Sequence, residues 1–285
     1  MSKFKQALVK AEKSRKIGSQ QFFMDEEQQS DDLKPTLKMA HGVHPDVKVI
    51  YSKTKIHNVD HRRLLKNKVF SNQRADEITD QFNLLRLQIL QKLEEIGGNS
   101  LLITSANPGE GKTFTAINLS IRMAQELNRT VLLIDADLKN PIAKHHDFAN
   151  DFFTIKAEKG LADYLLGQAE LTDILLNPGI SKLTIIPAGR PLPNSAEHLG
   201  SLRLATLVDE MKNRYPEDRI IIFDGPSLLC ADPAVLSRFV DGILLVVEQE
   251  KTTKSDLNRA LKVLKNRKIF GTILNKSKSG KIAYV

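Results

Sequence analysis

The sequence has very little cysteine and no long apolar run. Cys230 is the single cysteine among 285 residues, which excludes an intrachain disulfide framework and suits a reducing compartment. No apolar run approaches the roughly 20 residues of a membrane-spanning helix, and the N-terminal residues contain no hydrophobic signal core. No internal repeat occurs. These absences predict a cytoplasmic protein that would need a partner to act at a membrane.

The composition indicates how large a core the chain can form and gives only weak information about partners. A hydrophobic content of 41% over this length is enough for one large core with a separate flanking region. The net charge of +8 favours acidic partners. The basic residues are spread along the chain, however, and the local cluster at 262–268 is typical of a solvated helix face. We therefore expect no nucleic acid partner.

Three regions follow from the distribution of polar and apolar residues. Residues 1–75 are polar and charged, which predicts a flexible N-terminal extension with a few docking elements, among them a strand near 47–51. Residues 76–276 carry the regular apolar pattern of a globular domain. Residues 277–285 form a short basic C-terminal tail.

The pattern of the central region predicts an α/β fold. Near-continuous apolar segments alternate with segments of helical spacing, which is typical of a mostly parallel, doubly wound sheet with helices on both faces. A helical stripe from Ile78 to Ile96 precedes the first of these strands and stops at Gly97 and Gly98. The expected strands are 101–104, 131–134, 183–186, 220–223, 243–247 and 269–274.

A phosphate-binding loop lies between the first of these strands and a helical segment. Glycines let backbone N–H groups curl around phosphate oxygens, the lysine reaches the β- and γ-phosphates, and the threonine hydroxyl ligates Mg²⁺ at the positive end of a helix. Ala106 occupies the first position, where the pattern usually has glycine. The expected nucleotide-binding residues here are Pro108, Gly109, Glu110, Gly111, Lys112, Thr113 and Phe114.

Three aspartates follow two further strands. Asp135 and Asp137 come after 131–134, and Asp224 comes after 220–223. Ligands bind at the carboxyl edge of an open α/β sheet, so these acids can converge with Lys112 on one phosphate chain. Asp224 is expected to hold Mg²⁺, Asp137 to ligate or support it, and Asp135 to orient or deprotonate an attacking hydroxyl. Each acid alone could simply end a strand or cap a helix, but three behind one P-loop favour catalysis.

These motifs together resemble the bacterial protein-tyrosine kinases that regulate exopolysaccharide synthesis and export. The resemblance covers about residues 76–276 in order and implies that they form a P-loop kinase or ATPase domain. The N-terminal extension is similar to the cytosolic, exosortase-associated branch. It implies that Lys112 and Thr113 bind the phosphates and Mg²⁺ of ATP, that Asp135 and Asp137 form the additional Walker A′ motif, and that Asp224 is the Walker B acid. It also implies that Asn275 contacts the adenine, and that the γ-phosphoryl group passes to a tyrosine hydroxyl.

The sequence departs from the family pattern in three places. The C-terminal tyrosine cluster is missing, which leaves Tyr284 as the candidate phosphoacceptor. The ring-forming helix of the family has an acid and two arginines at three-residue steps, and this chain has Asp80, Asn83 and Arg86 there. Lys139 replaces the arginine that follows the A′ acids, which keeps the charge but loses bidentate geometry.

The resemblance also implies partners. Family members assemble into homo-oligomeric rings and need a membrane activator, so this chain would be recruited to the inner face of the membrane by a separate, membrane-embedded polysaccharide chain-length regulator. Two alternatives stay open. A partitioning or division-site ATPase shares the fold but carries a signature lysine where this chain has Asn107. A catalytically silent, nucleotide-sensing regulator of polysaccharide export would explain the missing tyrosines.

Overall fold

The structure is a computed structural model that describes residues 55–57, 59, 62, 64, 67, 69, 77–139, 148–214 and 219–277. The predicted docking strand near 47–51, most of the predicted extension and the tail with Tyr284 lie outside these residues. None of the described helices is long and apolar enough to cross a membrane.

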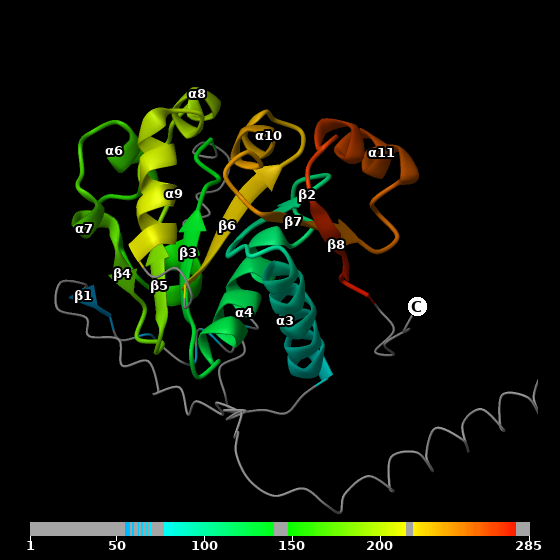
Figure 1. Ribbon diagram of the computed structural model, residues 1–285, viewed down its shortest axis with the longest axis horizontal. Helices are drawn as coiled ribbons and strands as arrows, with labels where there is room; N and C mark the ends of the chain where they lie inside the picture. The colour runs from blue at the N-terminus through cyan, green and yellow to red at the C-terminus, as the bar shows by residue number, and fades with distance from the viewer. Residues whose placement is uncertain are drawn as a thin grey trace, which may run out of the picture. The chain divides into compact units, whose positions relative to one another are not determined.

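An eight-stranded sheet organises the described residues (Figure 1). Its strand order is β1-β4-β5-β3-β6-β2-β7-β8, and all neighbours pair in parallel except β4 and β5, which are antiparallel. This confirms the predicted mostly parallel, doubly wound sheet. The strands are β1 (Lys55–Ile56), β2 (Ser100–Ser105), β3 (Thr130–Asp135), β4 (Leu176–Asn177), β5 (Leu183–Ile186), β6 (Arg219–Ser227), β7 (Gly242–Glu248) and β8 (Ile269–Asn275).

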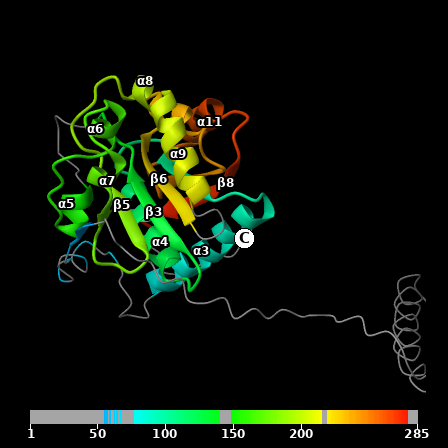
Figure 2. The ribbon, with the colours of Figure 1, turned by 60° about the vertical axis from the view of Figure 1, so that its left-hand side comes forward.

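Helices cover both faces of this sheet, as the turned view also shows (Figure 2). Successive residues of a strand point to opposite faces, so Leu101 and Ile103 of β2 belong to one apolar core while Leu102 belongs to the other. The first core is closed by α3 (Glu77–Glu95), α4 (Lys112–Ala124) and α5 (Phe148–Phe153). The second core is closed by α6 (Leu161–Leu165), α7 (Leu171–Ile174), α8 (Ser195–Leu199), α9 (Leu202–Arg214), α10 (Asp232–Leu236) and α11 (Lys254–Val263).

Part of the predicted N-terminal extension contributes to this fold. β1 pairs with β4 at the edge of the sheet, and the backbone N–H of His57 donates to Asn177. Leu64 and Val69 are fully buried in the core that α3, α4 and α5 close. Residues before 76 therefore supply a strand and core side chains.

Several strands are longer than the sequence pattern indicated, and β6 shows the largest difference. β6 was expected to stop before Asp224, but it continues to Ser227, so Asp224 lies within the strand. The pairing of β2 with β6 changes register between Ile103 and Ser105. That irregularity lets the last residues of β6 continue beside the start of the P-loop.

Candidate functional site

The P-loop connects β2 to α4 through two glycines in a left-handed conformation. Gly109 and Gly111 have φ angles of 79° and 98°, which are strained for any residue with a side chain. A Cβ on Gly111 would also lie 1.9 Å from the side-chain nitrogen of Asn275. Lys112 begins α4, so the unpaired N–H groups of the first helical turn open at the loop.

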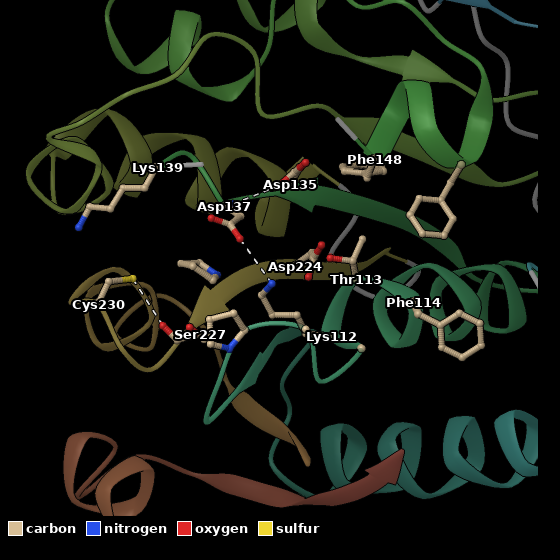
Figure 3. Close-up of a pocket in the computed structure, with 15 residues that line it drawn as sticks. Lys112, Thr113, Phe114, Asp135, Asp137, Lys139, Phe148, Asp224, Ser227 and Cys230 are labelled. Carbon is tan, nitrogen blue, oxygen red and sulfur yellow. Dashed lines mark hydrogen bonds and ion pairs between the residues drawn. The ribbon is translucent and has the colours of Figure 1, made fainter. Parts of the chain in front are cut away.

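A cavity of about 620 Å³ opens between this loop and the ends of β3 and β6. Figure 3 shows Lys112 and Thr113 from the P-loop facing Asp135, Asp137 and Asp224 across it. The sequence assigned all five side chains to one site, and the structure brings them together. Pro108, Gly109, Gly111 and Phe114 also line this cavity.

Lys112 lies among the three carboxylates. Its Nζ is 3.4 Å from Oδ2 of Asp137. The backbone N–H of Asp137 donates a 3.1 Å hydrogen bond to Oδ1 of Asp135, and Asp135 is paired with Asp224 in the register of β3 and β6. Lys112 therefore lies among three acids that come from the ends of two adjacent strands.

The electrostatics of the cluster follow from burial. Burial raises the pKa of Asp135 well above its usual value, and the neighbouring charge of Asp224 adds to the effect. Burial likewise raises the pKa of Asp224 to about 6, against the opposing attraction of Lys112. Burial lowers the pKa of Lys112, but the charges of Asp224 and Asp137 outweigh it, so its pKa lies above the usual value and the lysine stays charged.

Thr113 and Asp224 have the relation expected of a magnesium-binding pair. The Thr113 side chain hydrogen-bonds to the Asp224 carboxylate. Oδ1 of Asp224 is buried and has no hydrogen-bond partner among the residues that the structure describes. A buried carboxylate oxygen without a partner is costly, unless a cation or water completes it. The residues present therefore fit a hard divalent cation at this point.

Three aromatic side chains line another part of the cavity, and the sequence had assigned only Phe114 of them to the site. Phe114 comes from the first turn of α4 and Phe148 from α5 (Figure 3), and Phe152 also belongs to α5. Phe114 packs edge-to-face on Phe82 of α3, with ring centroids 5.9 Å apart. The six residues of α5 are too few to show a helical period, so no sequence signal distinguished Phe148 and Phe152 from core residues.

Two residues predicted to bind nucleotide make protein contacts instead of lining the cavity. The Glu110 side chain is buried and accepts hydrogen bonds from the backbone N–H of Asn107, at 2.9 Å, and from the Thr252 hydroxyl. The amide of Asn275 donates to the backbone carbonyl of Glu110 at 2.8 Å. The adenine contact expected of Asn275 stays a prediction.

Lys139 and Arg86, two of the residues compared with the family pattern, form ion pairs within the chain. Lys139 lines the cavity and its Nζ lies 2.9 Å from Oδ1 of the buried Asp232. Asp80 is exposed on α3 and Asn83 is half-buried. Arg86 forms a 3.0 Å ion pair with Glu126, which lies just after α4. Tyr284 lies outside the described residues.

Cys230 lies at the cavity wall beside Ser227. Its thiol donates a 3.5 Å hydrogen bond to the Ser227 carbonyl, and burial raises its pKa above the usual value. A raised pKa keeps the thiol protonated and unreactive. The surroundings of Cys230 therefore suit a packing role and not a reactive one.

Comparison with known proteins identifies the family. The AAA domain family matches residues 99–273. Tyrosine-protein kinase CpsD of Streptococcus agalactiae is 31% identical over 206 residues, which cover 72% of this chain and 84% of CpsD. The kinase domain of the Escherichia coli tyrosine kinase Etk is 30% identical, with 74% of this chain and 81% of that chain covered and a TM-score of 0.63.

A more distant likeness concerns the fold alone. The septum site-determining protein MinD of Pyrococcus horikoshii is 24% identical, with 63% of this chain and 72% of that chain covered and a TM-score of 0.50. The division-site ATPases are thus relatives by fold, and the kinases are nearer in both sequence and structure. The chain belongs to the family of bacterial tyrosine-protein kinases.

Proposed function

We propose that this protein is an ATP- and Mg²⁺-dependent tyrosine kinase that phosphorylates a tyrosine of its own chain or of a second copy, and that this phosphorylation regulates exopolysaccharide polymerisation or export. The main support is the convergence of Lys112, Thr113, Asp135, Asp137 and Asp224 on one cavity. A P-loop alone would indicate only nucleotide binding. The paired acids opposite the lysine add a place for an attacking hydroxyl.

The roles proposed for these residues follow from charge and position. Lys112 would neutralise charge on the β- and γ-phosphates, while the N–H groups at the start of α4 bind the phosphate oxygens. Asp135 would orient the acceptor phenol and accept its proton, because its raised pKa makes it a stronger base than an ordinary aspartate. Asp137 would hold Lys112 in place through their ion pair. The result is catalysis by positioning and charge neutralisation.

Thr113 and Asp224 would hold Mg²⁺, with Asp137 as a supporting ligand. In the described part of the chain, no three His, Cys, Asp or Glu side chains are arranged to hold a metal by themselves. Magnesium in phosphoryl-transfer sites is usually bound by one or two side chains together with substrate phosphates and water, so no such cage is required. When bound, the ion would draw off negative charge that develops on the transferred group.

The partners follow from the family. We propose that the protein forms homo-oligomers and is recruited from the cytoplasm to the inner face of the membrane by a membrane-embedded polysaccharide chain-length regulator, whose cytoplasmic segment activates it. Asp80 and Asn83 remain available to a neighbouring subunit on the outer side of α3, whereas Arg86 is engaged with Glu126. Asp80→Ala should therefore shift the oligomer distribution more than Arg86→Ala, as measured by light scattering.

Phosphosite mapping by mass spectrometry tests the proposed activity. The purified protein is incubated with Mg·ATP and a cytoplasmic peptide of a candidate chain-length regulator, with Lys112→Met and Tyr284→Phe in parallel. We expect phosphotyrosine in the wild type and none in Lys112→Met. Loss of the signal in Tyr284→Phe identifies Tyr284 as the acceptor, whereas an unchanged total places phosphate on another tyrosine.

Two other outcomes would support the alternatives. Bound ATP with no phosphotyrosine in any condition would indicate a nucleotide-sensing regulator without kinase activity. ATP-dependent DNA binding that weakens steeply with salt would indicate a partitioning ATPase. The second is disfavoured by Asn107, whose side-chain oxygen accepts a 2.9 Å hydrogen bond from Arg259 at the position where that class has its signature lysine.

A further inference from the structure

The end of β8 holds two backbone carbonyls of the P-loop. Lys276 Nζ donates to the carbonyl of Gly109 at 2.7 Å, and the Asn275 side chain donates to the carbonyl of Glu110 at 2.8 Å. In the sheet, β7 lies between β8 and the P-loop strand β2. In the sequence, the contacts join segments about 165 positions apart. Neither Asn275 nor Lys276 lines the cavity.

The direction of these carbonyls fixes the direction of the phosphate-binding N–H groups. A trans peptide is planar, so the C=O of one residue and the N–H of the next point to opposite sides. With the Gly109 carbonyl held by Lys276, the N–H of Glu110 is turned away from β8. With the Glu110 carbonyl held by Asn275, the N–H of Gly111 is turned the same way. The cavity lies on that side, because its lining includes the ends of β3 and β6, which flank β2 on the side opposite to β7 and β8.

The loop needs such fixing because its glycines alone do not impose one conformation. Glycine adopts positive and negative φ about equally well, so the peptides beside Gly109 and Gly111 can rotate unless neighbours hold them. The Glu110 side chain supplies a third constraint, because the Thr252 hydroxyl and the Asn107 N–H bind its buried carboxylate. Glu110 is thus held by its side chain and by its carbonyl.

Lys276 is itself positioned by Glu248 at the end of β7. Its Nζ lies 3.0 Å from Oε2 of Glu248, an oxygen that Lys251 also approaches at 3.3 Å. The Glu248 carboxylate is mostly covered, at 13% exposed, whereas Lys276 is 48% exposed. An exposed lysine held between a carboxylate and a loop carbonyl is restricted to one geometry, which an isolated surface lysine is not.

We propose that Lys276 and Asn275 are positioning residues that keep the N–H groups of Glu110 and Gly111 directed at the nucleotide phosphates. The proposal rests on the proposed function only in that its ligand is a nucleotide. These residues act through the P-loop backbone and not through contact with the phosphates. Affinity for phosphate-bearing ligands should therefore depend on Lys276, while affinity for the nucleoside part should not.

Binding measurements on the full chain test this. Lys276→Met removes the donor at similar length, Lys276→Arg keeps a donor, and Lys251→Met is the matched control, because it removes the other cation beside Glu248 but makes no P-loop contact. Mg·ADP and adenosine are titrated by calorimetry. We expect Lys276→Met to weaken ADP binding about fivefold, a modest loss for a charge-assisted hydrogen bond at a half-exposed site. Lys276→Arg should recover most of it.

Adenosine and Lys251→Met provide the contrast. Adenosine affinity should be unchanged in Lys276→Met, and ADP affinity should be unchanged in Lys251→Met. Amide hydrogen exchange of the P-loop should accelerate in Lys276→Met without nucleotide, with unchanged exchange in α9. Equal ADP affinity in Lys276→Met and wild type, or equal losses for ADP and adenosine, would overturn the proposal. Absence of ADP binding by the wild type would instead overturn the proposed function.

Discussion

The Nζ atom of Lys139 lies 2.9 Å from Oδ1 of Asp232, a carboxylate that is fully buried at the start of α10. The other oxygen of Asp232 accepts a 2.5 Å hydrogen bond from the hydroxyl of Ser195 in α8. Lys139 follows β3 and lines the cavity. The pair therefore ties the loop after the A′ acids to the helix after β6. Lys139, at the position where the family usually has arginine, thus forms an ion pair with Asp232.

The first prediction concerns this pair. Lys139→Met should destabilise the protein by about 1–3 kcal/mol, because it leaves a buried carboxylate without its cation. Asp232→Asn should cost less, since the amide keeps a hydrogen bond with Ser195. The double variant should be more stable than the sum of the two losses indicates. Urea denaturation of the three variants gives the coupling energy, and strict additivity would show that the pair contributes nothing.

Leu64 carries the second prediction. Its side chain is fully buried although it lies in the region that the sequence assigned to a flexible extension. Leu64→Ala should lower the free energy of unfolding by about 2–4 kcal/mol through the lost transfer free energy and the cavity left behind. Leu202→Ala is the control, because Leu202 is 81% exposed and should change stability by less than about 0.5 kcal/mol. Similar effects of the two variants would place Leu64 outside the folded core.

Part of the fold and of the site could be predicted from the sequence, and part could not. Apolar strands and the aspartates that follow them are contiguous signals, so the sheet and the meeting of Lys112 with Asp135, Asp137 and Asp224 could be predicted. β1 and β4 have two residues each, too few to show any alternation. Their existence depends on tertiary pairing, which no local pattern encodes.

The sequence also could not predict which side chains of the P-loop motif face the ligand. Glu110 lies in the middle of the P-loop motif, and its position suggested a nucleotide contact, yet its carboxylate is buried against Asn107 and Thr252. Thr252 is 142 positions away, and only the packing of the β7–α11 connection beside the loop brings it there. Long-range partners of this kind decide which residues of a motif face the ligand.

The third prediction concerns Asp241, which directly precedes β7. Burial alone would raise the pKa of Asp241, but hydrogen bonds from Ser100, Asn99 and Lys212 outweigh it and lower the pKa. A lowered pKa in the folded state stabilises the protein above the unfolded pKa, and this contribution is lost as the pH falls through the folded value. Asp241→Asn should therefore be destabilised by about 1–3 kcal/mol at pH 7, with the difference from the wild type shrinking below about pH 4. Urea titrations from pH 3 to pH 8 measure this, and a constant difference would contradict it.

Asp224 should show the opposite dependence, and this is the fourth prediction. Its pKa is raised to about 6 by burial, so the folded state binds a proton more readily than the unfolded chain does. Stability then falls as the pH rises from the unfolded pKa, near 4, to about 6, and the penalty is complete above that.

Asp224→Asn should accordingly stabilise the protein without nucleotide or Mg²⁺ at pH 8 by on the order of 2 kcal/mol, with no gain below about pH 4. The same variant should lose phosphotransfer, because the amide cannot replace the carboxylate beside Thr113. Chemical denaturation in EDTA at pH 4, 6 and 8 decides the first point, with Asp241→Asn as the variant of opposite sign. If Asp224→Asn were less stable than the wild type at pH 8, the carboxylate would be stabilising the empty site. If Asp224→Asn gains stability and loses activity, the Asp224 carboxylate destabilises the empty protein and is needed for binding and phosphotransfer.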